Sequence, residues 1–76
     1  MRLDDLTAGE SGRVTGFTPG NKPYRRKLLA MGLTPGTEFA VTRYAPMGDP
    51  VELRVRGFAL SLRRAEAAFL EVERTA

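Results

Sequence analysis

The sequence predicts a small, mainly β protein: a five-stranded barrel with one α-helix inserted between the first and second strands. Short segments that alternate between apolar and polar residues are typical of half-buried strands, and one basic segment instead has apolar residues at helical spacing. Turn-forming glycines and prolines separate these segments. Small β-rich chains with this spacing close into sandwiches or barrels, which hide the edges of their strands.

Length and composition limit the chain to one compact unit. It has 76 residues, of which 42% are hydrophobic, so we expect a single domain over residues 1–76 with one small core. There is no cysteine, which excludes disulfides and thiolate metal sites. The first ten residues, MRLDDLTAGE, carry acids where a signal peptide has an apolar run, and no stretch approaches the roughly 20 apolar residues of a membrane span. We therefore expect a cytoplasmic protein.

The first strand is expected at residues 12–18, GRVTGFT, which alternate weakly around Val14 and Phe17 between two glycines. Leu3 and Leu6 precede this segment, and we expect them to pack into the core ahead of it.

The next segment, NKPYRRKLLAMG, has the periodicity of a helix. Apolar residues recur on one face, at Tyr24, Leu28 and Met31. Asn21 is a favourable N-cap, Pro23 suits the first turn, and Gly32 suits the left-handed position that ends a helix, with Leu33 folding back on it.

A turn and a second strand follow this helix. TPGT, residues 34–37, places Pro35 and Gly36 as in a type II turn, in which the glycine takes a positive φ. In the strand TEFAVTRYA, Phe39 and Val41 are expected to face the core.

The clearest pattern is a β-hairpin in VELRVRGFALSL, residues 51–62. Apolar residues change from odd to even positions at Arg56-Gly57, which predicts a two-residue turn there. The predicted pairs are Val55 with Phe58, Leu53 with Leu60 and Val51 with Leu62, all on the core face. RRAEAAF then forms a helical turn, and FLEVE closes the sheet with Leu70 and Val72 inward. The sum is a small SH3-like barrel with the helix over one opening.

The sequence contains two candidate binding surfaces, a cluster of basic residues and a loop with an apolar residue near its tip. The formal charge is +3, and Lys22, Arg25, Arg26 and Lys27 lie within six residues, which favours contact with an acidic partner or with anionic lipid beside it. The alternative is that these residues are only the solvated back of the helix. The second candidate is the loop APMGDP, residues 45–50, with Met47 and Asp49; Met47 either binds a partner or folds over one end of the barrel.

The residue types argue against catalysis. Nucleophilic sites and zinc or ferrous sites usually need histidine or cysteine, and both are absent. Surface carboxylates such as Asp4 and Asp5 are expected to be ordinary solvated acids, and no phosphate-binding loop of the G-x-x-x-x-G-K-[ST] type is present. We therefore expect no enzyme activity, no cofactor and no metal site.

Together these motifs make the chain resemble FeoA, a family of small proteins of bacterial ferrous iron uptake. The resemblance rests on LLAMGLTPGTEF after the basic helix, on the loop APMGDP, on the hairpin and on LRRAEAAFLEV, and it extends from about Gly12 to Glu73. It implies an SH3-like barrel with an accessory or regulatory role, acting by interaction with the cytoplasmic part of a FeoB-like GTPase-permease. It also implies that the protein reaches the membrane only through that partner.

The alternative is a stand-alone SH3-like regulatory or nucleic-acid-binding module, related to the C-terminal domain of metal-dependent repressors of the diphtheria toxin repressor type. The chain lacks the winged-helix and dimerisation segments of such repressors. Nucleic-acid-binding barrels also present aromatic rings for stacking. Here only 8% of residues are aromatic, Phe39 and Phe58 are assigned to the core, and only Tyr44 and Phe17 are candidates for exposure. No nucleic-acid partner is expected.

Overall fold

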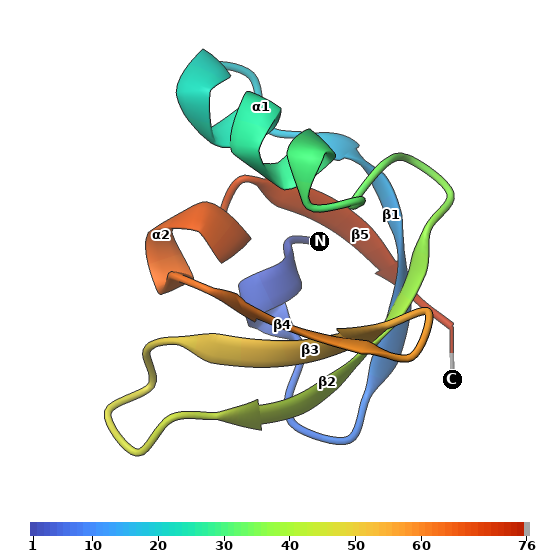
Figure 1. Cartoon of the computed structure of the whole chain (residues 1–76), viewed down its shortest axis with the longest axis vertical. Coiled ribbons are helices and arrows are strands. Elements are labelled where there is room, and N and C mark those ends of the chain that lie inside the picture. Colours follow the sequence, from blue (N-terminus) through green and yellow to red (C-terminus); the bar gives the residue numbers. More distant parts are fainter. Residues whose placement is uncertain (76) are drawn as a thin grey trace.

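The computed structural model describes residues 1–75, which form one antiparallel sheet, two α-helices and a short 3-10 turn (Figure 1). In chain order the elements are η1 (Leu3–Asp5), β1 (Ser11–Phe17), α1 (Lys22–Ala30), β2 (Glu38–Tyr44), β3 (Val51–Val55), β4 (Phe58–Leu62), α2 (Arg64–Ala67) and β5 (Leu70–Arg74). The strand order is β4-β3-β2-β1-β5. The predicted architecture of five strands with a helix between the first two is confirmed.

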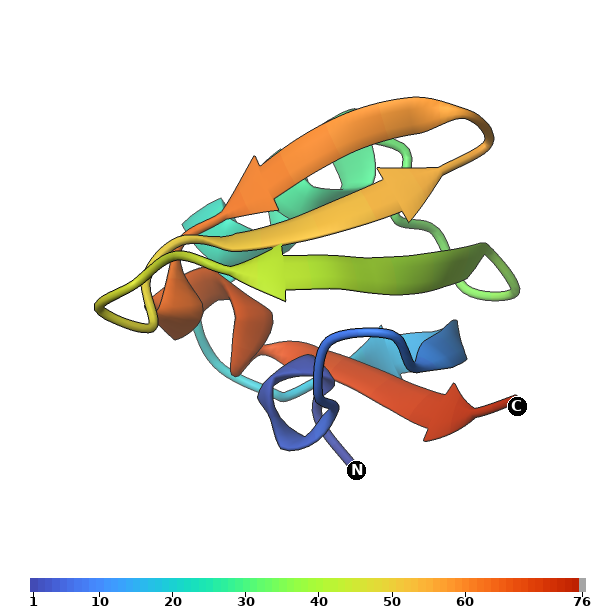
Figure 2. The ribbon, with the colours of Figure 1, turned by 90° about the horizontal axis from the view of Figure 1, so that it is seen from below.

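The sheet curls around the core, so that β2, β3 and β4 lie on one side and β1 and β5 on the other (Figure 2). The strand register shifts between Val14 and Gly16 and again between Val41 and Arg43. Such bulges bend a strand and increase its twist, which helps a sheet to curl. The two edge strands, β4 and β5, do not pair with each other in the described chain, and α2 connects them.

The core fills the inside of this curl. Its buried apolar residues come from every element: Leu3, Leu6, Val14, Leu28, Leu33, Phe39, Val41, Val51, Leu53, Val55, Leu62, Ala67, Leu70 and Val72. The inward positions predicted for Phe39, Val41, Leu70 and Val72 are confirmed. With so small a core, each buried side chain supports several elements at once.

Helix α1 begins and ends where its sequence predicts. The side chain of Asn21 accepts a hydrogen bond from the backbone N–H of Tyr24, 3.1 Å away. At the other end Gly32 has a φ of +91°, and the N–H of Leu33 returns to the carbonyl of Leu28 at 3.1 Å, as in a Schellman motif. Leu28 and Leu33 are both completely buried, so the helix end is fixed to the core.

The turn at Thr34–Thr37 joins α1 to β2 and also contacts β1. Gly36 has a φ of +92°, as predicted for a type II turn, and the N–H of Thr37 donates to the carbonyl of Thr34 at 3.0 Å. Gly36 donates to the carbonyl of Val14 at 2.7 Å, and Val14 donates to that of Thr37 at 2.8 Å. The turn is therefore hydrogen-bonded to the middle of β1.

The β3–β4 hairpin has the predicted register, with Val55 opposite Phe58 and a two-residue turn at Arg56 and Gly57. Both turn residues have positive φ, +51° and +84°, as a type I′ turn requires. The assignment of Phe58 to the core was wrong, because its side chain is 72% exposed. Since β4 is an edge strand, no neighbouring strand within residues 1–75 covers the inward-facing side of this ring.

Tyr44 and Phe17, expected to be the exposed rings, are instead partly buried against the core. The hydroxyl of Tyr44 donates to the carbonyl of Leu6 at 2.6 Å, which ties the end of β2 to the N-terminal segment. The bulge after Val41 changes the facing of the rest of β2, so simple alternation does not apply to Tyr44.

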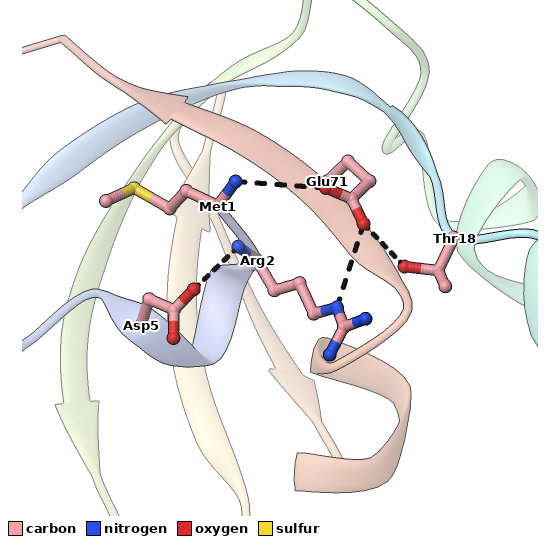
Figure 3. A network of polar contacts seen from close by, with 5 residues as sticks. All are labelled: Met1, Arg2, Asp5, Thr18 and Glu71. Atoms are coloured by element: carbon pink, nitrogen blue, oxygen red, sulfur yellow. Dashed lines mark hydrogen bonds and ion pairs between the residues drawn. The ribbon is translucent and has the colours of Figure 1, made fainter.

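The N-terminal segment lies along the outer edge of β5 (Figure 3). The carbonyl of Met1 accepts a hydrogen bond from the N–H of Val72 at 2.8 Å. The carboxylate of Glu71 accepts a hydrogen bond from the hydroxyl of Thr18 at 2.7 Å and lies 3.7 Å from the Arg2 guanidinium. This edge of the sheet is therefore covered by the chain itself.

We expect Leu53→Ala to lower the free energy of unfolding by about 2 to 5 kcal/mol, because it opens a cavity at a completely buried position. Phe58→Ala on the neighbouring strand is the matched control and is expected to cost much less, because that ring is mostly exposed. Urea denaturation measures both. Similar losses for the two variants would contradict the described packing of the hairpin.

Candidate functional site

Helix α1 and the loop at residues 45–50 carry all the predicted site residues, and helix α2 contacts both of them. Figure 1 shows α2 between the other two segments, at the end of the curled sheet where β3 begins and β4 ends. The site is therefore best described through the contacts that α2 makes with each of its neighbours.

The contact between α1 and α2 is an ion pair with a buried carboxylate. Lys27 Nζ lies 2.5 Å from Glu66 Oε2, and the other oxygen of Glu66 accepts a hydrogen bond from the backbone N–H of Arg63 at 2.9 Å. Glu66 is only 4% exposed. Burial raises the pKa of this carboxyl, but the hydrogen bonds from Lys27 and Arg63 outweigh it and leave the pKa of Glu66 below its ordinary value. Glu66 is thus held as an anion under α1.

An aromatic contact runs beside this ion pair. The rings of Tyr24 on α1 and Phe69, which follows α2, meet edge to face with centroids 5.3 Å apart. The carbonyl of Phe69 also accepts a hydrogen bond from the N–H of Thr18 at 2.9 Å. Helix α1 is consequently held by polar and apolar contacts together.

The opposite side of α1 borders a shallow groove of about 500 Å³. Lys22 and Arg25 line it together with the apolar side chains of Phe17, Leu29 and Pro35. The guanidinium of Arg25 lies 5.8 Å from the centroid of the Phe17 ring. The groove therefore combines two cations with a partly exposed apolar floor.

The loop at residues 45–50 is attached to the start of α2. The N–H of Arg64 donates to Asp49 Oδ1 at 3.1 Å, and its guanidinium donates to the carbonyl of Gly48 at 3.4 Å and lies 5.7 Å from the centroid of the Tyr44 ring. Burial raises the pKa of the Tyr44 hydroxyl. The side chain of Met47 is 92% exposed at the tip, so it does not fold over the barrel end.

The predicted site residues thus fall into two groups, with α2 between them. Lys22 and Arg25 belong to the groove, and Met47 and Asp49 belong to the loop. Arg26 is exposed on α1 and makes no ion pair within residues 1–75. Lys27 differs from its neighbours because its ammonium is engaged by Glu66.

Charge is distributed unevenly over the molecule. The cations that make no ion pair within the described chain lie on α1, on the β3–β4 hairpin and beside or on α2: Lys22, Arg25, Arg26, Arg54, Arg56, Arg63 and Arg64. The N-terminal segment and β5 carry Asp4, Asp5, Glu10, Glu71 and Glu73; the last three pair with Arg74, Arg2 and Arg13, and Asp4 and Asp5 make no ion pair within residues 1–75. Figure 2 shows α1 and the hairpin on one side of the molecule, and the N-terminal segment and β5 on the other.

The described residues contain no group of side chains placed to hold a metal ion. No three acidic side chains in residues 1–75 are grouped so that they would hold a metal ion, and the sequence has no histidine or cysteine to add. None of the helices in this part of the chain has the length and apolar character needed to cross a membrane. The surface of the described residues presents unpaired cations, exposed apolar side chains and shallow grooves.

Sequence reasoning missed two apolar features of this surface, Phe58 and Leu29. Phe58 is 72% exposed beside the end of α1, and Leu29 is 36% exposed in the groove. For Leu29 a signal was available, because it lies outside the face formed by Tyr24, Leu28 and Met31. For Phe58, alternation predicted the face of the strand on which the ring lies, but it could not reveal that β4 is an edge strand.

A family model and a curated relative identify the same family. The model of the FeoA domain family matches residues 1–74. A fusion of Fe(2+) transport protein A and Fe(2+) transporter FeoB from Porphyromonas gingivalis is 37% identical over 73 residues, which are 96% of this chain and 8% of the fusion protein. This chain thus spans a small part of that relative.

Solved structures extend the comparison to the fold. The FeoA-like protein from Clostridium acetobutylicum is 39% identical with a TM-score of 0.92, over 100% of this chain and 87% of the other. FeoA from Stenotrophomonas maltophilia, described as an SH3 domain protein and solved in complex with zinc, is 26% identical with a TM-score of 0.82, over 96% of this chain and 89% of the other. The SH3-like fold predicted from the sequence is confirmed.

We expect Glu66→Gln to lower the free energy of unfolding at pH 7 by about 1 to 3 kcal/mol, the usual cost of a weakened buried hydrogen-bonded group. The pKa of Glu66 is lower in the folded protein than its ordinary value of 4.5, so the ionised carboxylate stabilises the fold at pH values above 4.5. This contribution is lost as the pH falls through the folded-state pKa of Glu66. The difference in unfolding free energy between wild type and Glu66→Gln should therefore be smaller at pH 3 than at pH 7.

Urea denaturation at both pH values measures this gap. Glu38→Gln serves as the control, because that side chain is 71% exposed and its ion pair with Arg13 spans 3.8 Å at the surface. A gap for Glu66→Gln that is equally large at pH 7 and pH 3 would show that the ionised carboxylate does not stabilise the fold.

Proposed function

This chain belongs to the FeoA domain family, and on that premise we propose that it is a cytoplasmic accessory or regulatory protein of ferrous iron uptake, acting through contact with the cytoplasmic part of a FeoB-like GTPase-permease. The observation that carries this proposal is the relative in which a similar domain and FeoB are one polypeptide. Covalent linkage gives two domains a high effective concentration for each other, an arrangement that suits domains that interact.

A role in binding also fits the chemistry of the chain. Without histidine or cysteine it lacks the commonest general base, a thiol nucleophile, and the imidazole and thiolate ligands that zinc and iron usually take. Any GTP hydrolysis in the proposed complex is therefore assigned to the partner. This chain would contribute a binding surface to the complex.

We assign the main contact to the basic face, which we define as Lys22, Arg25 and Arg26 of α1. Its cations make no ion pair within the described chain, and the adjoining groove offers Phe17 and Leu29 for apolar contact. An acidic surface on the partner would complement this combination. Cations at the rim of an interface mainly raise the association rate and set the orientation of binding.

The loop at residues 45–50 is the second proposed contact. Asp49 and Gly48 fix the loop to Arg64, so Met47 is presented at a defined position although it is 92% exposed. A flexible thioether at such a position adapts well to an apolar site on another protein. Lys27 we assign to the structure rather than to the contact, because it pairs with Glu66.

We expect the double variant Arg25→Glu and Arg26→Glu to associate more slowly with the purified cytoplasmic part of a FeoB-like protein, and to show less dependence on salt. Its melting temperature should stay within a few degrees of wild type, because exposed substitutions usually change stability by under about 0.5 kcal/mol. Surface plasmon resonance at several salt concentrations measures the association rate.

The control is Arg43→Glu with Arg74→Glu, which changes the net charge equally but on β2 and β5. If both double variants associate equally slowly, net charge rather than the basic face governs the encounter. If a folded Arg25→Glu and Arg26→Glu variant binds like wild type, the contact lies elsewhere, and Met47→Ala becomes the variant that decides for the loop.

A further inference from the structure

The two edges of the sheet are treated differently. The outer edge of β5 is covered by the N-terminal segment, through the hydrogen bond from the N–H of Val72 to the carbonyl of Met1 and the β-bridge between Arg2 and Glu71. Figure 3 shows the N-terminal amine of Met1 and the side chain of Arg2 beside the Glu71 carboxylate. The outer edge of β4 pairs with no segment of the described chain. The N-terminal segment thus covers the edge of β5, whereas the edge of β4 has no pairing partner within the described residues.

The geometry of the hairpin identifies the free backbone groups. Val55 and Phe58 flank a two-residue turn, so they form a hydrogen-bonded pair, and the pattern alternates along the ladder. The backbone N–H and C=O groups of Ala59 and Ser61 therefore point away from β3. Neither residue makes a hydrogen bond on that side within residues 1–75, and both have small, exposed side chains that leave the edge accessible.

Apolar surface lies directly inside this edge. A groove of about 320 Å³ runs between the end of α1 and β4, lined by Met31, Val55, Phe58 and Leu60. Phe58 is 72% exposed and Leu60 is partly exposed, although both face the core side of the sheet. A further strand beside β4 would place its own inward side chains against these two residues and continue the core.

Charge selects the kind of strand that fits. Arg54 and Arg56 on the hairpin and Arg63 just beyond β4 have no ion-pair partner in the part of the chain that the structure describes. Pairing of β4 with β4 of a second copy would bring these cations together, and like charges across a strand pair are destabilising. An acidic strand would instead neutralise them.

We propose that the outer edge of β4 binds an extended acidic segment of another protein as an additional strand, with a bulky apolar side chain of that segment in the groove between α1 and β4. Backbone hydrogen bonds to Ala59 and Ser61 would supply affinity, and the groove and the arginines would supply specificity. This surface is separate from the basic face and does not depend on the partner proposed above.

The test uses two short peptides, acetylated and amidated, with the sequences Glu-Phe-Glu-Val-Glu and Lys-Phe-Lys-Val-Lys. They are titrated into the ¹⁵N-labelled full chain and followed by amide chemical shifts. We expect the acidic peptide to shift the signals of residues 58–62 and to bind at least about tenfold more tightly than the basic one. Equal binding of the two peptides, no binding of the acidic one, or shifts confined to α1 would overturn the proposal.

A matched pair of variants isolates the backbone contact. Ala59→Pro removes the outward N–H, which is tolerated on an edge strand, whereas Ala59→Val keeps it. We expect the proline variant to lose at least about tenfold in affinity for the acidic peptide, and the valine variant to bind like wild type. A folded proline variant that binds like wild type would refute strand addition.

Two further measurements complete the test. Phe58→Ala should weaken peptide binding without unfolding the chain, so it tests whether the groove takes part in binding even if Ala59→Pro fails to fold. Unchanged binding by Phe58→Ala would show that the groove does not bind the peptide. Sedimentation of the chain alone should give the mass of a monomer, because the edge of β4 is not expected to pair with a second copy. Concentration-dependent shifts at residues 58–62 without peptide would show that a second copy takes this edge instead, against the proposal.

Discussion

The ion pair between Lys27 and the buried carboxylate of Glu66 is the contact on which the arrangement of the helices depends. It is the most buried ion pair of the described chain, and it joins α1 to α2, the element that connects the two edge strands. If Lys27 is removed, the buried Glu66 carboxylate remains under the helix without its cation, which is more costly than losing an exposed pair. The position of the basic face therefore depends on a residue that is hardly visible from outside.

Much of the fold was predictable because its determinants are local. Asn21 and Gly32 mark the ends of α1, Gly36 marks a turn with positive φ, and the change of phase at Arg56-Gly57 sets the hairpin register. Each of these signals needs only the covalent neighbours of a residue to act. They were sufficient for the order of the elements along the chain and for the register of the hairpin.

Features that depend on distant parts of the chain were not predictable in this way. Lys27 and Glu66 are far apart in sequence, and nothing near either residue marks it as half of a pair. Alternation predicted the facing of Phe58 correctly but did not reveal that no other strand of residues 1–75 lies on the outer side of β4. The candidate site shows the same limit: the basic run of α1 reads as one patch, yet one of its members is occupied by the fold.

The uneven distribution of charge gives the molecule a permanent electric dipole, with its positive end at α1 and the hairpin. The molecule measures 28 × 25 × 22 Å, whereas the Debye length at physiological ionic strength is about 8 Å. A partner approaching the positive end is therefore screened from the acids of the N-terminal segment and β5. It meets a potential more positive than the net charge of +3 suggests, and the torque on the dipole turns the molecule toward an acidic surface before the two touch.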